Sequence, residues 1–251
     1  MVQRPAARHQ YLDWDGVLAF AHRGGTGVHP ENTMAAFAHA VELGYTYLET
    51  DVHLTADGVL VAFHDEDLER TCGRPGKIAE LPWSEVAAAR VADREPIPLL
   101  EDLLGQFPEA RINIDCKSDG AVEALLATLR RTNSLDRVCV GAFSDARLRR
   151  LRSLAGPGLC TSLGPRETAR LVGGLPIGSG AHAAQVPVRS GPVRVVTSAT
   201  VNRAHRRGLQ VHVWTIDDPE EMGRLIDLGV DGIMTDQPEV LRSVLIERGK
   251  W

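Results

Sequence analysis

Residues 209–247, LQVHVWTIDDPEEMGRLIDLGVDGIMTDQPEVLRSVLIE, alternate between two kinds of segment. Two short apolar runs, 209–214 and 232–235, each precede a segment with helix signals. Pro219 and Pro238 suit the first turns of these two helices. Apolar runs of this length are typical of strands that are buried on both faces. Strands that alternate with helices predict a parallel sheet.

The same alternation continues toward the N-terminus. Further apolar runs lie at residues 18–22, 47–53, 59–64, 112–117, 138–142, 159–163 and 183–188, and helix candidates lie at 32–43, 119–132, 145–154, 166–172 and 198–207. Eight strand–helix units in about 230 residues predict an α/β fold, a closed (β/α)8 barrel of the TIM type. We expect a single domain over residues 1–251, with its core at about 18–247. The alternative is an open doubly wound sheet, although no G-x-G-x-x-G follows an apolar run.

One surplus apolar run points to a hairpin. The chain has nine such runs, and the second and third are separated only by Thr55-Ala56-Asp57-Gly58. Asp-Gly between two alternating runs is a strong hairpin signal. We therefore expect a β-hairpin over residues 47–64 that distorts the barrel.

The register of this hairpin decides which side chains share a face. A two-residue loop pairs Asp51 with His64, whereas a four-residue loop pairs Glu49 with His64. Because side chains alternate with a period of two, both registers place Glu49, Asp51 and His64 on one face. The hairpin alone thus predicts two acids and one imidazole side by side.

Composition and charge narrow the class of protein. The net charge is −5, whereas a nucleic-acid binder usually carries a basic stripe, so we expect no nucleic-acid partner. No stretch approaches 18 uninterrupted apolar residues, so no transmembrane segment is expected, and the first ten residues precede no apolar signal-peptide core. The four cysteines form no C-x-x-C pair, which favours a reducing compartment and a cytoplasmic location. Nothing in the sequence indicates an oligomeric state.

Polar side chains gather where the predicted strands end. In a (β/α)8 barrel the carboxyl ends of the strands form the active site. Charged side chains in apolar runs are costly unless they are paired or bind a metal. The irregular segment from residue 65 to about 98 follows one strand end and is a candidate wall or lid. The candidate site residues are His22, Arg23, Glu49, Asp51, His64, Asp115, Lys117 and Trp214.

The types of these residues predict chemistry at phosphorus. Carboxylates are hard oxygen donors that suit one divalent cation, Mg²⁺ or Ca²⁺. For Glu49 and Asp51 the alternative is a structural ion pair with Arg23 or Lys117. The planar fork of Arg23 and the point charge of Lys117 match phosphate oxygens, and two histidines can exchange protons near neutral pH. Cations, a metal and a histidine pair around one anion fit displacement at phosphorus.

Several short motifs together resemble one known family. They are Ala21-His22-Arg23-Gly24-Gly25, Pro30-Glu31-Asn32-Thr33, Glu49-Thr50-Asp51-Val52, Phe63-His64-Asp65, Ile112-Asn113-Ile114-Asp115-Cys116-Lys117 and Val230-Asp231-Gly232-Ile233-Met234-Thr235-Asp236-Gln237-Pro238. Over residues 18 to about 240 the chain resembles the glycerophosphodiester phosphodiesterases. The resemblance implies a phospholipase-C-like barrel that uses a divalent cation. Its substrates would be small glycerophosphodiesters, split into glycerol 3-phosphate and an alcohol.

The resemblance also implies a role for each candidate residue. Asp115 departs from the pattern, because this position usually holds Glu, and its shorter side chain affects the choice of metal. Which histidine is the acid and which is the base stays open. So does the choice between direct attack by water and attack by the glycerol 2-hydroxyl to give a cyclic phosphate. The implied roles are an acid/base pair, His22 and His64; phosphate binding, Arg23 and Lys117; metal ligation, Glu49, Asp51 and Asp115; and a pocket wall, Trp214.

Two other functions fit parts of the pattern. Lysophospholipid cleavage of the lysophospholipase D type would need an apolar groove, for which Leu81-Pro82-Trp83 is the candidate. The second alternative is a non-catalytic barrel that binds phosphorylated ligands. Asp115 in place of the usual Glu would then indicate that catalytic function has been lost. Outside the site, we expect Asn32 and Asp217 to cap helices and Asp236 to cap the helix that starts at Pro238.

Overall fold

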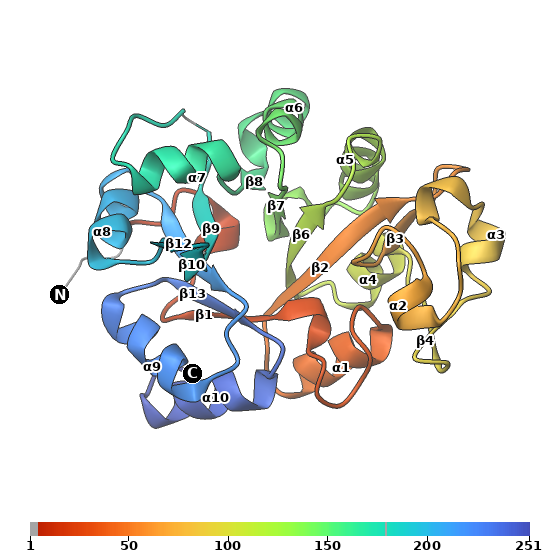
Figure 1. Cartoon of the computed structure of the whole chain (residues 1–251), viewed down its shortest axis with the longest axis horizontal. Coiled ribbons are helices and arrows are strands. Elements are labelled where there is room, and N and C mark those ends of the chain that lie inside the picture. The colour runs from red at the N-terminus through yellow and green to blue at the C-terminus, as the bar shows by residue number, and fades with distance from the viewer. Residues whose placement is uncertain (1–4, 179) are drawn as a thin grey trace.

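A nearly closed barrel of eight parallel strands forms the centre of the computed structural model, which describes residues 5–178 and 180–251 (Figure 1). The strands follow the order β8-β7-β6-β2-β1-β13-β12-β9, and a parallel bridge between Ser162 and Ala183 joins the two ends of this order. The predicted barrel is confirmed, because an open doubly wound sheet would leave its edge strands apart. The bounds are β1 Leu18–Ala21, β2 Tyr47–Leu54, β6 Arg111–Cys116, β7 Val138–Gly141, β8 Cys160–Thr161, β9 Ala183–Pro187, β12 Gln210–Trp214 and β13 Gly232–Thr235, with β3 Leu60–Ala62 antiparallel to β2.

Amphipathic helices surround the barrel (Figure 1). In α5 the fully buried residues Val122, Leu125 and Leu129 recur at helical spacing, and Arg130 and Arg131 occupy the last turn, where cations favour the helix dipole. No helix in the described part of the chain is long and apolar enough to cross a membrane. The outer helices are α1 Met34–Glu42, α4 Leu100–Gln106, α5 Ala121–Arg131, α6 Asp145–Ala155, α7 Pro165–Val172, α8 Ser198–Arg206, α9 Pro219–Leu228 and α10 Pro238–Glu247.

The hairpin over residues 47–64 is confirmed, but both predicted registers are wrong. Val52 of β2 lies opposite Ala62 of β3. The chain reverses through a three-residue loop, 56–58, whereas the sequence suggested a loop of two or four residues. The ladder is therefore shifted by one residue from either prediction, and it ends before His64. His64 reaches the site from the turn after β3, not from a ladder face shared with the acids of β2.

The irregular segment 65–98 packs around a small apolar core of its own. Buried residues such as Leu68, Ile78 and Val86 form this core, and Leu81 and Trp83 pack against it. The predicted apolar groove at these last two residues is therefore wrong, because neither side chain lines the active-site cavity. The segment contains α2 Glu69–Cys72, η3 Ile78–Glu80, α3 Trp83–Val86 and the strand pair β4 Arg90–Val91 with β5 Glu95–Pro96.

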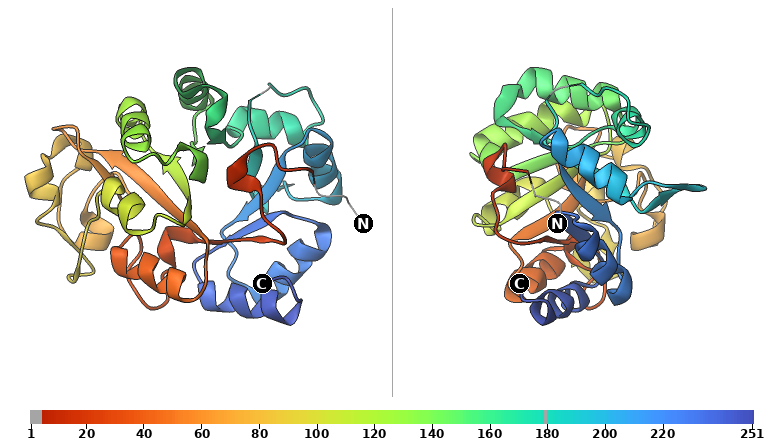
Figure 2. Two further views of the ribbon diagram at one scale, coloured as in Figure 1. Left: turned by 180° about the vertical axis from the view of Figure 1, so that it is seen from behind. Right: turned by 90° about the vertical axis from the view of Figure 1, so that its left-hand side faces the viewer.

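Residues 9–13 close the end of the barrel opposite the strands' carboxyl ends, as the view from behind shows (Figure 2). Tyr11, in the 3₁₀ turn η1 (Gln10–Leu12), is fully buried, and its carbonyl accepts a hydrogen bond from the Tyr47 hydroxyl at 2.7 Å. β1 pairs with β13, with Leu18 opposite Gly232. The first strand of the barrel is thus held by the last. Two further 3₁₀ turns lie outside the site, η4 Leu135–Arg137 and η5 Gly156–Gly158, whereas η2 His22–Gly24 belongs to it. The exposed strand pair β10 Arg189–Ser190 with β11 Val193–Arg194 borders the cavity through Ser190.

Helix α1 begins one residue later than the sequence predicts. Its cap is Thr33, whose Oγ1 accepts a hydrogen bond from the Ala36 N–H at 3.2 Å. Asn32 has a left-handed backbone with φ 55°, and its Nδ2 donates to Asp51 Oδ2 at 3.1 Å. The interpretation of Asn32 as the cap is therefore wrong, because its side chain serves β2 instead.

Replacing Thr33 with Ala should lower the free energy of unfolding by about 1 kcal/mol, because the Ala36 N–H loses its acceptor. Urea denaturation followed by circular dichroism measures this change. Ser144→Ala is the matched control, since Ser144 caps α6 in the same way by accepting from the Arg147 N–H. A loss in Thr33→Ala below about 0.3 kcal/mol, within the range of surface substitutions, would contradict the assigned cap.

Candidate active site

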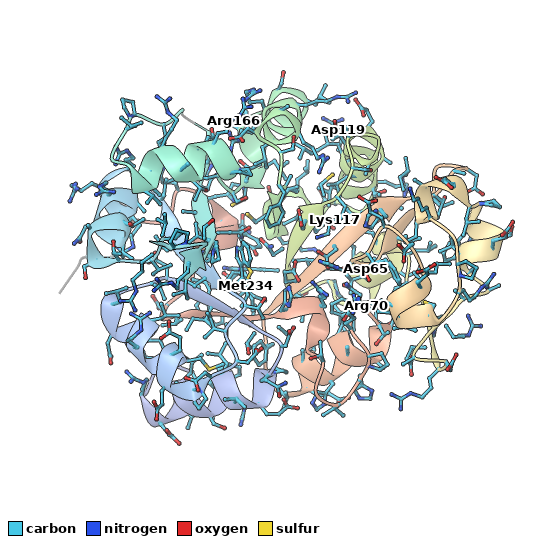
Figure 3. The ribbon with its side chains drawn as sticks, viewed as in Figure 1. Asp65, Arg70, Lys117, Asp119, Arg166 and Met234 are labelled. Atoms are coloured by element: carbon cyan, nitrogen blue, oxygen red, sulfur yellow. The ribbon has the colours of Figure 1, made fainter. Side chains whose placement is uncertain are left out.

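A cavity of about 490 Å³ opens at the carboxyl ends of the barrel strands. Figure 3 shows Lys117 and Met234, two of its lining residues, near the centre of the molecule. The structure brings together every site residue that the sequence predicts, although their chemical roles stay predictions. The lining includes His22, Arg23, Glu49, Asp51, His64, Asp115, Lys117 and Trp214.

A left-handed turn after β1 aims the first two site residues, which form η2 with Gly24. The backbone φ is 52° at Arg23 and 82° at Gly24. A Cβ on Gly24 would come within 2.8 Å of the Ala36 Cβ in α1, so this close contact requires glycine. The Arg23 N–H then donates to Glu49 Oε2 at 3.1 Å, which ties the turn to β2.

His22 is held between two carboxylates. Its Nδ1 donates to Asp236 Oδ1 at 2.7 Å, and its Nε2 lies 3.7 Å from Glu49 Oε2. Burial lowers the pKa of His22, but the charge of Glu49 and the hydrogen bond to Asp236 outweigh it. The pKa of His22 therefore lies above its usual value, which favours the protonated imidazole.

The interpretation of Asp217 and Asp236 as helix caps is wrong. The cap of α9 is Asp218, and Gln237 precedes α10 without a side-chain cap. Asp217 Oδ1 instead accepts from the Asp236 N–H at 2.8 Å, so the two acids form a chain of contacts that ends at His22. The signal for Asp236 was its place directly after β13, the same kind of place that selected the other site residues.

Replacing Asp236 with Asn should lower the pKa of His22, because a neutral amide stabilises the imidazolium less than a carboxylate does. Proton–carbon NMR of the histidine Cε1 signals over a pH series measures this pKa, with His22→Gln to assign the signal. Asp227→Asn is the control, since this exposed acid pairs with Arg248 on the outer surface. An unchanged His22 pKa in Asp236→Asn would contradict the assigned contact.

Lys117 lies between two acids on one side of the cavity. Asp51 on β2 is the register partner of Asp115 on β6. Lys117 Nζ lies 2.7 Å from Asp51 Oδ1 and 2.7 Å from Asp115 Oδ2, and Arg23 Nε lies 3.4 Å from Asp51 Oδ2. The structural ion pair considered as an alternative is thus present for Asp51, whereas Glu49 accepts only the backbone N–H of Arg23.

Glu49 and Asp51 are the side chains that best fit a divalent cation. Both are nearly fully buried, and burial together with the charge of Asp51 raises the pKa of Glu49 to about 7. Two buried carboxylates that destabilise each other are a hard oxygen donor set for Mg²⁺ or Ca²⁺. Among the residues that the structure describes, no three His, Cys, Asp or Glu side chains already form a metal-binding group. Asp115, the third predicted ligand, shares Lys117 with Asp51 and is more exposed than Asp51.

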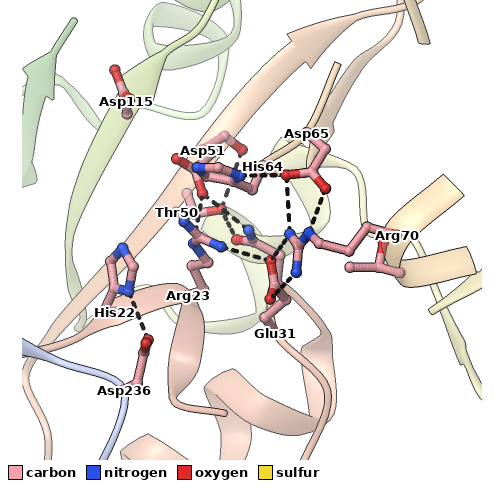
Figure 4. Close-up of polar contacts among 12 residues, drawn as sticks. His22, Arg23, Glu31, Thr50, Asp51, His64, Asp65, Arg70, Asp115 and Asp236 are labelled. Atoms are coloured by element: carbon pink, nitrogen blue, oxygen red, sulfur yellow. Dashed lines mark hydrogen bonds and ion pairs between the residues drawn. The ribbon is translucent and has the colours of Figure 1, made fainter. Parts of the chain in front are cut away.

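His64 is backed by a carboxylate and a guanidinium. Its Nδ1 donates to Asp65 Oδ1 at 2.6 Å, and Asp65 Oδ2 accepts from Arg70 Nε at 2.5 Å (Figure 4). The hydrogen bonds from Arg70 are the main reason that the pKa of Asp65 falls to about 2. Asp65 therefore stays ionised at neutral pH and can stabilise a positive charge on His64.

The remaining walls of the cavity hold residues that the sequence did not single out. Phe143 is 68% exposed, and its ring packs edge-on against Trp214 with centroids 5.7 Å apart. Gln185 Nε2 donates to Asn113 Oδ1 at 2.6 Å at the cavity wall. Uncharged residues in strands carry no sequence signal for a site, because most of them belong to cores. The other apolar lining residues include Ala142, Leu163, Pro165, Pro187 and Val195.

Comparison with known proteins identifies the family. The sequence model of the glycerophosphoryl diester phosphodiesterase family matches residues 22–240. The chain is 41% identical over 252 residues to the "Probable glycerophosphodiester phosphodiesterase 2" of Mycobacterium tuberculosis, covering 96% of each chain. It is 30% identical to "Lysophospholipase D GDPD1" of Homo sapiens, over 90% of this chain and 85% of that one. A crystal structure of a glycerophosphodiester phosphodiesterase from Parabacteroides distasonis matches with a TM-score of 0.76 at 27% identity, over 94% of this chain and 99% of that one. The chain belongs, as its motifs predict, to the glycerophosphoryl diester phosphodiesterase family.

Proposed function

We propose that this chain is a phosphoric diester hydrolase that converts a glycerophosphodiester and water into glycerol 3-phosphate and an alcohol. One observation carries the proposal: two histidines, each hydrogen-bonded to a carboxylate, line the same cavity as Arg23 and Lys117. Cations bind a phosphodiester anion and stabilise the charge that grows on it, while histidines move protons to and from its oxygens. The substrate is thus a small molecule bound at the mouth of the barrel.

The surroundings of the two histidines suggest how they divide the work. The pKa of His22 is raised by Glu49 and Asp236, which favours the protonated imidazole and so suits donation to the oxygen of the departing alcohol. His64 takes a proton from the attacking water or glycerol 2-hydroxyl as its oxygen bonds to phosphorus and the bond from phosphorus to the alcohol oxygen breaks, and Asp65 stabilises the imidazolium that forms. Arg23 and Lys117 hold the phosphate oxygens between the two histidines.

Glu49 and Asp51 would hold the divalent cation on which the family generally depends. When bound, this cation would polarise the phosphoryl group and offset its negative charge. Asp115 is the third ligand that we propose. It would exchange its contact with Lys117 for the metal when Lys117 turns to the phosphate. Oxygen donors of this kind suit Mg²⁺ or Ca²⁺.

The release of glycerol 3-phosphate from glycerophosphocholine tests the activity. The protein is first stripped of metal, and Mg²⁺, Ca²⁺ or Mn²⁺ is then added back. We expect release that depends on the added ion. Binding of glycerol 3-phosphate without turnover in all three ions would instead favour the non-catalytic binder of phosphorylated ligands.

The apolar wall supports a second candidate function, cleavage of lysophospholipids of the lysophospholipase D type. An exposed Phe143 beside Trp214 could contact an acyl chain, whereas Leu81, Pro82 and Trp83 are not among the residues that line the cavity. If lysophospholipids are substrates, Phe143→Ala should reduce kcat/KM for lysophosphatidylcholine about tenfold, as expected for losing one apolar contact, and leave glycerophosphocholine unaffected. Choline release from both substrates measures this. Equal effects on both would contradict an acyl-chain contact.

We also propose a cytoplasmic location. The four cysteines Cys72, Cys116, Cys139 and Cys160 are all free and buried. Cys139 and Cys160 are register partners on β7 and β8, so two thiols lie side by side without a disulfide. Free thiols in this arrangement are typical of proteins from a reducing compartment.

A further inference from the structure

We propose that Arg70 is a positioning residue that aligns both the general base His64 and the phosphate-binding Arg23. The inference rests on the proposed function. Arg70 belongs to the short helix α2 in segment 65–98, not to the barrel, and it is not among the residues that line the cavity. It therefore acts through other residues.

The guanidinium of Arg70 binds two carboxylates at once, each through two nitrogen atoms. Its Nε and Nη2 lie 2.5 and 3.0 Å from the two oxygens of Asp65. Its Nη1 and Nη2 lie 2.8 and 2.7 Å from the two oxygens of Glu31. Paired contacts of this kind fix the plane of a carboxylate as well as its distance, which a lysine ammonium cannot do.

Each carboxylate passes this orientation to one site residue. Asp65 Oδ1 accepts from His64 Nδ1 at 2.6 Å, and Glu31 Oε1 accepts from Arg23 Nη1 at 2.8 Å (Figure 4). One side chain thus connects the turn after β3 with the loop after β1. No other side chain in the described part of the chain bonds both Asp65 and Glu31.

The contacts are built to hold geometry rather than to stabilise the fold. Arg70 itself is about half exposed, and pairs at such positions contribute little to the free energy of unfolding. Its partners are less exposed, at 16% for Glu31 and 21% for Asp65. Without Arg70 no single cation would join these two acids, and the carboxylates that support His64 and Arg23 would lose their fixed orientation. Small displacements of reacting groups can cost about 100-fold in rate.

Replacing Arg70 with Ala should therefore lower kcat/KM for glycerophosphocholine about 100-fold, with little change in the melting temperature. Guanidinium ion at millimolar concentration should restore part of the activity, because the side chain is accessible from solvent, whereas urea should not. Arg70→Lys should recover less than guanidinium does. Arg74→Ala is the matched control: it removes the same charge from the same segment, and among the described residues Arg74 makes no ion pair.

A double variant that removes both carboxylate partners shows whether Arg70 acts only by positioning them. In the double variant Glu31→Gln with Asp65→Asn, adding Arg70→Ala should cost no further activity, since Arg70 would have nothing left to align. A further 100-fold loss there, or an equal loss in Arg74→Ala, would overturn the proposal. Calorimetry measures the binding of inorganic phosphate, which needs no turnover. It therefore tests whether Arg70 positions Arg23 even if the proposed hydrolysis fails. Unchanged phosphate affinity in Arg70→Ala would overturn that half.

Discussion

His64→Ala is expected to lower kcat for release of glycerol 3-phosphate by about 10³-fold, within the range that a single general acid or base contributes. His64 lies at the cavity with its Nδ1 bonded to an ionised Asp65, which leaves Nε2 as the nitrogen available to a reacting hydroxyl. Alanine removes both nitrogens and leaves the cations and carboxylates in place. Substrate binding should therefore change much less than kcat.

A coupled assay for glycerol 3-phosphate, run with saturating divalent cation, measures kcat and KM separately. His29→Ala is the control, because this histidine lies outside the cavity and contacts the ring of His39. If His64→Ala raised KM while kcat stayed within threefold, His64 would be a binding residue and the assignment as base would fail.

Glu49→Gln is expected to change activity and stability in opposite directions. Loss of groups that merely support a metal ligand costs 10- to 100-fold, so loss of a ligand should cost at least about 100-fold in metal-dependent activity. The metal-free protein should nevertheless become more stable at alkaline pH. The reason is the pKa of about 7 that burial and Asp51 give Glu49, against an ordinary value of 4.5.

The sign of the stability change follows from this difference. Below pH 4.5 Glu49 is neutral in both the folded and unfolded states and costs nothing. Between pH 4.5 and 7 the unfolded chain ionises first, so the stability of the folded state falls as pH rises, and above pH 7 the full loss of about 3 kcal/mol is present. The metal-free Glu49→Gln protein should thus gain most of this amount at pH 8 and little at pH 5.

Urea denaturation in a metal chelator at the two pH values measures this difference. Glu101→Gln is the control, since this exposed acid pairs with Arg131 on the outer surface. Equal stability of Glu49→Gln and the unchanged protein at pH 8 would show that Glu49 is not held ionised against its surroundings.

The barrel and the members of its site were predictable because both depend on periodic features. Short apolar runs between helix signals define the strands, and a charged residue at the end of such a run is costly enough to signal function. This reasoning placed its eight candidate residues at the cavity, although it missed uncharged lining residues such as Phe143 and Gln185. The hairpin was predictable from Asp57-Gly58, but its register was not, because loop length depends on the backbone φ of single residues such as Gly58 at 86°.

The residues that support the site were harder to predict, because their partners are distant in sequence. His22 and Asp236 meet only once the first and last strands pair. Asn32 looks like a helix cap because Asn is among the best capping residues, but the structure uses the next residue, Thr33, and the turn after β1 directs Asn32 to Asp51 instead. Arg70 lies in a segment whose apolar residues follow no simple period, so no pattern linked it to the barrel.

The pairing of the first strand with the last has a consequence for how the chain folds during synthesis. Leu18 leaves the ribosome long before its partner Gly232 exists. At typical translation rates of 5 to 20 residues per second, the delay is roughly 10 to 40 s. Through this interval β1 lacks the neighbour that closes the barrel, and Tyr11 has only part of its covering. Contacts so distant in sequence slow folding. Because β13 is made last, the barrel can close only after translation nears completion. Chaperones that shield apolar segments would act on this chain in that period.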